Sequence, residues 1–174
     1  DLTLQEAATR TGYTFSSWYT KSDAGTLVTT ETIVLTASDH TIFAHWTAKE
    51  LSFANQTLGN GTYNAPYNKN NTFTAATYLN ETTTAVCTYS VVEVKRADIN
   101  TDSFSTVTAT SSGKYNGLGL SGTTISADKV TAAGTYKLTI RATDSVTSQS
   151  IDAVIIIIIL QLDITNGGKA SITL

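Results

Sequence analysis

A chain of 174 residues with a formal net charge of -3 and only 14% charged residues carries too little charge of one sign to indicate a nucleic-acid partner. Its single cysteine, Cys87, excludes an intrachain disulfide framework. The frequent threonines are typical of pleated, half-exposed β surfaces, so the composition favours a β-rich extracellular protein. The length allows one large domain or two small ones, and a change of pattern at residues 47–50 favours two.

Aromatic residues and glycines are concentrated near the N-terminus. They fall in three stretches: Arg10-Thr-Gly-Tyr13-Thr-Phe15-Ser-Ser-Trp18-Tyr19, Gly25-Thr-Leu27-Val28 and Thr41-Ile42-Phe43-Ala44-His45-Trp46. The pattern resembles the internalin-B-type repeat, also called the Listeria/Bacteroides repeat, a small β-rich module of bacterial surface proteins. The resemblance implies such a module at residues 1–48. Family members usually begin upstream with an extended segment that ends in Asn-Gly-Gly, and nothing before Asp1 supplies it, so the module lacks its first strand.

The middle of the chain predicts a β-sandwich from its alternation alone. In the clearest strand, residues 135–143, Tyr136, Leu138, Ile140 and Ala142 point to one face and the intervening polar residues to the other. Shorter alternations occur at residues 72–75, 87–91 and 105–109, separated by Gly, Asn and Asp clusters. Several short strands with turns between them indicate an all-β sandwich with Greek-key connections.

This region also carries a resemblance. Its blocks are Gly61-Thr-Tyr63-Asn-Ala-Pro-Tyr67, Thr88-Tyr89-Ser90-Val91, Leu120-Ser-Gly122-Thr-Thr-Ile125 and Gly134-Thr-Tyr136-Lys-Leu-Thr-Ile140-Arg-Ala142-Thr-Asp144. They are similar to the immunoglobulin-like or cadherin-like domain of bacterial surface proteins, which implies a sandwich at residues 49–161. In that family Tyr136 would occupy a tyrosine corner, with its phenol reaching back to a main-chain group. Residues 93–114 depart from the pattern as an insertion, expected to form an extra hairpin at an edge or an interface.

An apolar run at residues 153–160 contains five consecutive isoleucines. It is far shorter than the roughly 20 residues that a membrane-spanning helix needs, and β-branched residues favour a strand. A continuous apolar strand implies that both of its faces are covered. We therefore expect the outward face to pack against a neighbouring module or another protomer.

The last segment, residues 162–174, contains Leu162-Asp-Ile164-Thr-Asn166-Gly167-Gly168-Lys-Ala-Ser-Ile172-Thr. Asn-Gly between alternating apolar residues is a hairpin signal, because a type I′ turn needs positive φ at both central positions. The segment also resembles the missing beginning of the internalin-type module. Four readings stay open: a terminal hairpin of the second domain, or a strand that completes the module of another subunit, of the next covalent repeat, or of its own chain.

Candidate chemistry is sparse. His40 and His45 are the only histidines, and no paired carboxylate, nucleophile arrangement or phosphate loop accompanies them. Residues 98–102 place Asp98, Asn100 and Asp102 at alternate positions, but the glycine and the glutamate of a calcium loop are missing. We therefore expect no enzyme activity, no cofactor and no metal site.

The sequence as a whole predicts an extracellular structural module of a bacterial surface fibre or tandem-repeat protein. Its partners would be copies of itself, assembled head to tail by strand complementation, with no membrane span and no nucleic acid. The predicted assembly interface consists of Ile155, Ile157, Ile159, Leu162, Ile164, Asn166, Gly167, Ile172, Tyr13, Phe15, Trp18 and Trp46. The alternative is an adhesin or carbohydrate-binding surface module that holds a host or glycan ligand with loops such as residues 68–71 or 100–103.

Overall fold

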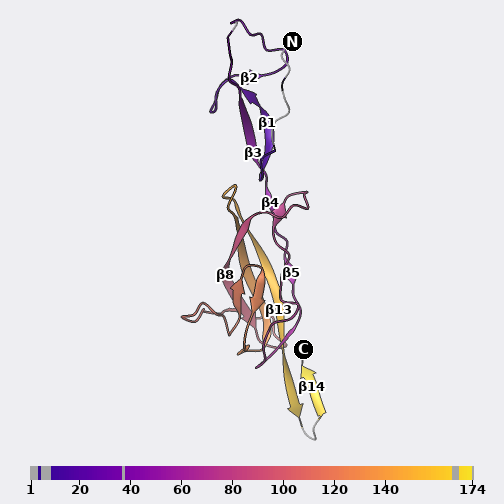
Figure 1. Ribbon diagram of the computed structural model, residues 1–174. Helices are drawn as coiled ribbons and strands as arrows, with labels where there is room; N and C mark the ends of the chain where they lie inside the picture. The colour runs from indigo at the N-terminus through magenta and orange to yellow at the C-terminus, as the bar shows by residue number, and fades with distance from the viewer. Residues whose placement is uncertain (1–3, 5–8, 37, 166–168, 174) are drawn as a thin grey trace. The chain divides into compact units, whose positions relative to one another are not determined.

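The protein is all-β (Figure 1). The computed structural model describes residues 4, 9–36, 38–165 and 169–173, and for residues 162–165 and 169–173 it describes the backbone alone. The chain divides into two compact units, residues 1–50 and 51–174. The sequence placed the first boundary at residues 48/49 and treated residues 162–174 as a separate segment. Among the described residues, no helix has the length and hydropathy that crossing a membrane requires.

The first unit is built on a three-stranded antiparallel sheet in the order β2-β1-β3. Its strands are β1 (Tyr13–Tyr19), β2 (Leu27–Val28) and β3 (Phe43–Ala48). The connection from β1 to β2 contains Gly25, whose φ of 113° is readily available only to glycine. The β1–β3 ladder is interrupted by a register shift between Phe15 and Ser17, which marks a β-bulge.

The second unit has one large sheet, in the order β14-β13-β12-β8-β9, with β5 and β6 added in parallel to β13. Two smaller antiparallel pairs, β10–β11 and β4–β7, complete its strands. The bounds are β4 (Leu51–Ser52), β5 (Gln56–Thr57), β6 (Gly61–Thr62), β7 (Thr77–Tyr78), β8 (Cys87–Ala97), β9 (Ser105–Thr106), β10 (Gly119–Ser121), β11 (Thr124–Ser126), β12 (Gly134–Asp144), β13 (Ser150–Thr165) and β14 (Lys169–Thr173).

The main hydrophobic core lies between the large sheet and the segments that cross it, and a smaller cluster contains Leu51, Tyr78 and Ala85. From the sheet, the core takes alternate residues of β12 and β13, for example Tyr136, Ile140 and Ile157, each fully buried. Residues 53–76 and 118–130 close the other side with Phe73, Ile125 and others. The predicted alternation of β12 is therefore confirmed, and the unit is sandwich-like.

Two features that were predicted for the sandwich, the tyrosine corner and the insertion at residues 93–114, can be compared with the structure. The hydroxyl of Tyr136 donates to the carbonyl of Ala132 at 2.8 Å, so the expected bond of the tyrosine corner is confirmed. The insertion at residues 93–114 begins as a continuation of β8 and returns as β9, which pairs with Lys95 and Arg96 at the edge of the large sheet. An edge hairpin, one of the two arrangements expected for it, is therefore what it forms.

Residues 72–75 are not a strand, contrary to the prediction. Thr72 makes one isolated bridge to Thr124. At Thr74 the side-chain amide of Gln56 takes the place of a neighbouring strand: its Oε1 accepts from the Thr74 backbone N–H at 2.7 Å, and its Nε2 donates to the Thr74 carbonyl at 3.0 Å. The predicted strand at residues 105–109 is shortened to β9.

The candidate assembly surface

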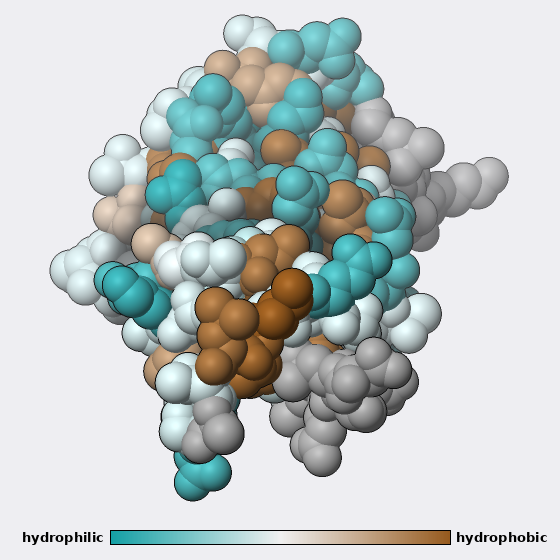
Figure 2. Space-filling view, turned by 90° about the horizontal axis from the view of Figure 1, so that it is seen from above, coloured by the Kyte–Doolittle hydropathy of each residue, from teal (hydrophilic) through white to brown (hydrophobic). Residues whose placement is uncertain are grey.

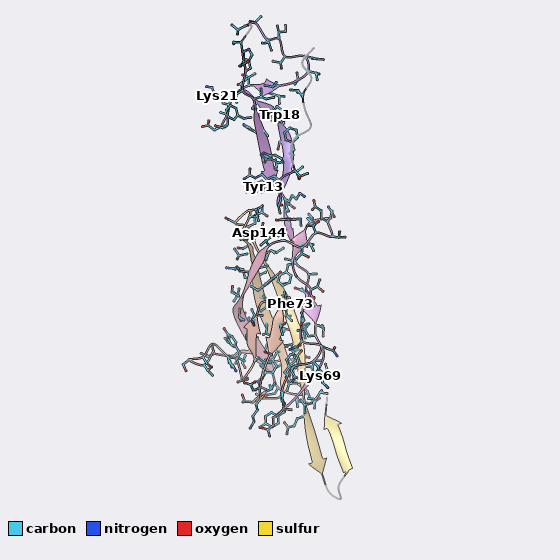
Figure 3. The ribbon with its side chains drawn as sticks, in the orientation of Figure 1. Tyr13, Trp18, Lys21, Lys69, Phe73 and Asp144 are labelled. Carbon is cyan, nitrogen blue, oxygen red and sulfur yellow. The ribbon has the colours of Figure 1, made fainter. Side chains whose placement is uncertain are left out.

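The first unit presents four of its aromatic residues on one face of its sheet. Cross-strand partners share a face, and the register pairs Tyr13 with Ala48, Phe15 with Trp46 and Trp18 with Ala44. Without the bulge after Phe15, strict alternation would send Trp18 to the opposite face. The bulge therefore gathers Tyr13, Phe15, Trp18 and Trp46 into one surface, the aromatic face (Figure 3 labels Tyr13 and Trp18 on β1).

The aromatic face is packed but only partly covered. The ring of Phe15 lies 5.5 Å from that of Trp18 and 5.7 Å from that of Trp46, in tilted and edge-on geometries. The guanidinium of Arg10 lies 4.0 Å from the centre of the Tyr13 ring. Yet all four aromatic side chains are only half-buried, and Val28 is the one large hydrophobic residue that is buried among the described residues of this unit. A core of this size is small for an independent domain.

The sheet of the first unit also has open edges. β3 pairs with β1 on one side, and the described residues provide no strand on its other side. β2 pairs with only Trp18 and Tyr19 of β1, so in the described part of this unit no strand pairs along the same edge at residues 14–17. An unpaired edge is a template for another strand.

The C-terminal segment forms a hairpin, one of the four readings that the sequence left open. β13 continues past the sandwich and pairs with β14, with Leu162 opposite Ile172 and Ile164 opposite Ala170. Apolar residues thus occupy alternate positions in both strands and are register partners of one another. Asn166 and Gly167, the predicted turn residues, lie outside the described residues. In the described part of the chain, β14 pairs with β13 and with no other strand.

Comparison with known families finds a match for the first unit. Residues 1–45 match the family model of the Listeria-Bacteroides repeat domain. The first unit is therefore similar to this repeat over nearly all of its length, and it is called the repeat domain below. The match covers 45 of the 174 residues and does not extend to the sandwich, whose resemblance to immunoglobulin-like domains it leaves untested. Comparison with curated proteins and with solved structures finds no significant match. Repeats of this family are typical of bacterial surface and extracellular proteins.

Three residues that were predicted to lie in the assembly interface lie in a hydrophobic core instead. Ile155, Ile157 and Ile159 are fully buried in the core of the second unit, so they are not available to another copy. Each inward isoleucine alternates with an outward residue along β13. This part of β13 pairs with β12 on one edge and with β5 and β6 on the other. The outward residues Val154, Ile156, Ile158 and Leu160 are half-exposed. The sequence could not distinguish the two faces of a run without polar residues.

Sequence reasoning also missed an apolar surface of the repeat domain. Ile33, Val34 and Leu35 precede β3 in an irregular segment and are 80%, 50% and 92% exposed. The sequence does contain a signal for this apolar surface, because three consecutive apolar residues without alternation fit neither a half-buried strand nor a polar loop.

The histidines are held by the backbone of the repeat domain. Nε2 of His45 lies 2.9 Å from the carbonyl of Lys21, and the ring stacks on Tyr19 at 4.0 Å. Nε2 of His40 lies 3.0 Å from the carbonyl of Thr36. Across the described residues, no three His, Cys, Asp or Glu side chains gather in a group that could hold a metal ion.

Two polar loops of the second unit border cavities. Residues 98–102 line a cavity of about 470 Å³ together with Thr135, Ile158 and Leu160. Asn68 and Lys69, with residues 60–62, line a smaller one of about 240 Å³. These are the two loops that the sequence indicated for a ligand in the alternative reading.

The one buried carboxylate of the described residues, Asp144, is structural. Burial raises its pKa, but hydrogen bonds from the hydroxyl and backbone N–H of Thr147, the N–H of Val146 and the hydroxyl of Tyr78 outweigh burial and hold the pKa below its ordinary value. Burial and the nearby Asp144 raise the pKa of the Cys87 thiol, which makes it a poor nucleophile.

Proposed function

We propose that the chain is a structural module of a bacterial surface fibre or tandem-repeat protein, and that it assembles head to tail. The C-terminal hairpin of one module completes the repeat domain of the next. The observation that carries this proposal is that, among its described residues, the repeat domain has one large buried hydrophobic residue and stretches of the β1 and β3 edges along which no strand pairs. The C-terminal hairpin of the chain offers the additional strands that such a domain can pair with.

The physics is that of β-strand addition. A hairpin that joins an open edge contributes main-chain hydrogen bonds, and its alternate residues contribute side chains to one face. In the hairpin, Leu162, Ile164, Ala170 and Ile172 are apolar register partners, and a half-covered aromatic face is the matching acceptor. Because donor and acceptor are different surfaces, the contact is heterologous and propagates without closing.

Separate copies and covalent repeats would use the same contact. In a tandem array, the hairpin of one repeat would complete the repeat domain that follows it in the same chain. In both cases the repeat domain gains its stability from a neighbour.

Deletion of residues 162–174 tests the proposal. We expect negative-stain electron microscopy to show threads or rods for the full chain and none for the deletion variant. The β-sheet circular dichroism of the second unit should persist, because the described residues up to Ile159 already form a hydrophobic core. The Ser171→Ala substitution, at a polar position of β14, is the matched control and should leave assembly unchanged. Threads formed by the deletion variant would overturn strand complementation.

A binding module is the second candidate, favoured by the cavity of about 470 Å³ beside residues 98–102. Carboxylate and amide groups next to apolar residues are a common lining for a small polar ligand. Glycan-array binding that is lost in Asn100→Ala and retained in Asn80→Ala would support an adhesin. We propose no catalytic role for either unit, because the sequence shows no paired carboxylate or nucleophile arrangement with either histidine.

A further inference from the structure

The repeat domain leaves a continuous apolar surface open in the segment between β2 and β3. Ile33 and Leu35 expose most of their side-chain surface, and Val34 exposes half. Figure 2 shows several brown, hydrophobic areas on this face of the molecule, the most prominent of them in the lower half of the picture. Single exposed apolar residues need no explanation, but three adjacent ones in one loop indicate a contact surface.

This apolar loop borders a cavity. The cavity has a volume of about 400 Å³ and is lined by Val28, Ile33, Val34, Leu35, Ile42, threonines and His40. Val28 is also the register partner of Trp18, so it belongs to the aromatic face as well. The apolar loop and the aromatic face are therefore joined through one buried side chain.

We propose that the cavity and its apolar loop, residues 33–35, receive the C-terminal hairpin of a second copy. This inference rests on the proposed head-to-tail assembly and names the part of the repeat domain that the hairpin contacts. The hairpin pairs with the open edge of β1, so that the side chains on one of its faces extend the aromatic face, and its apolar positions meet Ile33 and Leu35.

The composition of the two surfaces supports this occupant. Among the described residues that line the cavity there is no lysine, arginine, aspartate or glutamate, and two register pairs of the hairpin, Leu162–Ile172 and Ile164–Ala170, are apolar. Each hairpin strand has at least five paired residues, which span about 17 Å at roughly 3.4 Å per residue. A strand of that length can follow the seven-residue β1 for most of its extent.

The Leu35→Asp substitution in the full chain tests the inference. A charge placed on this surface must be desolvated on docking, so we expect the concentration needed for assembly to rise at least about tenfold. Leu35 is 92% exposed, so the fold should be retained. The control is Leu79→Asp, at an apolar residue of the second unit that is 47% exposed, which should assemble like the wild type.

The outcomes separate the two proposals. If the wild type assembles and Leu35→Asp assembles equally well, the apolar loop is not the contact, while strand complementation stands. If the wild type itself does not assemble, the head-to-tail proposal fails first.

A cross-linking experiment keeps the test independent of assembly thresholds. In a Cys87→Ser background, the pair Leu35→Cys and Ile172→Cys should give intermolecular disulfide ladders on oxidation. The pair Leu79→Cys and Ile172→Cys should not. Equal cross-linking in both pairs, or none in the first, would overturn the inference.

Discussion

At the scale of single residues, Asp144 links the stability of the second unit to pH. Asp144, which is labelled in Figure 3, is fully buried at the end of β12. The hydrogen bonds that its carboxylate accepts hold its pKa below the ordinary value of 3.8. A carboxylate with a lowered folded-state pKa stabilises the fold above its unfolded-state pKa, and this contribution is lost as the pH falls through the folded-state pKa.

We therefore expect Asp144→Asn to destabilise the second unit by about 1–3 kcal/mol at neutral pH, because hydrogen bonds to a charged acceptor are lost. The difference from the wild type should shrink as the pH falls from about 5 toward the folded-state pKa. Urea unfolding at a series of pH values measures this. Asp128→Asn, at a fully exposed side chain, is the control. A difference that stays constant with pH would contradict the linkage.

Gly134 is a position where the backbone conformation and the close approach of another strand require glycine. Its φ is 127°, and a Cβ atom there would lie 2.1 Å from the carbonyl oxygen of Ala97. Gly134→Ala should therefore cost about 2–4 kcal/mol, since both backbone strain and a steric clash with a neighbouring strand are introduced. Gly122→Ala, at a φ of 55° with no atom within 4 Å, should cost about 1 kcal/mol in the same unfolding assay. Equal losses would show that the clash is relieved.

At the scale of elements, the isoleucine run in β13 has two unlike faces. Ile157 is fully buried, whereas its neighbour Ile156 is half-exposed beside Lys137 on β12. Ile157→Thr should destabilise the second unit by about 2–4 kcal/mol, because it removes core contacts and buries a hydroxyl. Ile156→Thr should change the free energy of unfolding by less than about 1 kcal/mol. Thermal or urea unfolding compares the two, and similar losses would mean that the outward face is covered as well.

The elements also show where sequence reasoning works. β12 and the β13–β14 hairpin could be predicted because polar and apolar residues alternate there, and alternation maps directly onto the two faces of a strand. The strand proposed at residues 72–75 failed because a side chain, Gln56, replaces the backbone partner, and no local pattern records that. The isoleucine run predicted a strand, but it did not indicate which of the two faces of that strand is buried in the core. The aromatic residues of the site came from a family pattern, whereas the bulge that aligns Trp18 with them depends on pairing with β3.

At the scale of the whole molecule, the two units should differ in how their stability depends on protein concentration. Both tryptophans of the chain, Trp18 and Trp46, belong to the repeat domain, so tryptophan fluorescence reports on that unit alone. If a neighbour completes the repeat domain, its melting temperature must rise with concentration, because a partner that binds only the folded state stabilises it by about 2.7 kcal/mol at a hundredfold excess over Kd. The second unit has its own closed core, so its circular dichroism transition should not move.

The deletion of residues 162–174 supplies the control for that measurement. In the deletion variant, the fluorescence transition should lie at the low-concentration value of the wild type at every concentration, with the tryptophan emission shifted to longer wavelength. Adding a synthetic peptide of residues 161–174 should restore the wild-type transition in proportion to its concentration, because the hairpin then acts in trans. A repeat domain that melts at one temperature in all of these samples would be stable by itself, and the case for a donated hairpin would fall.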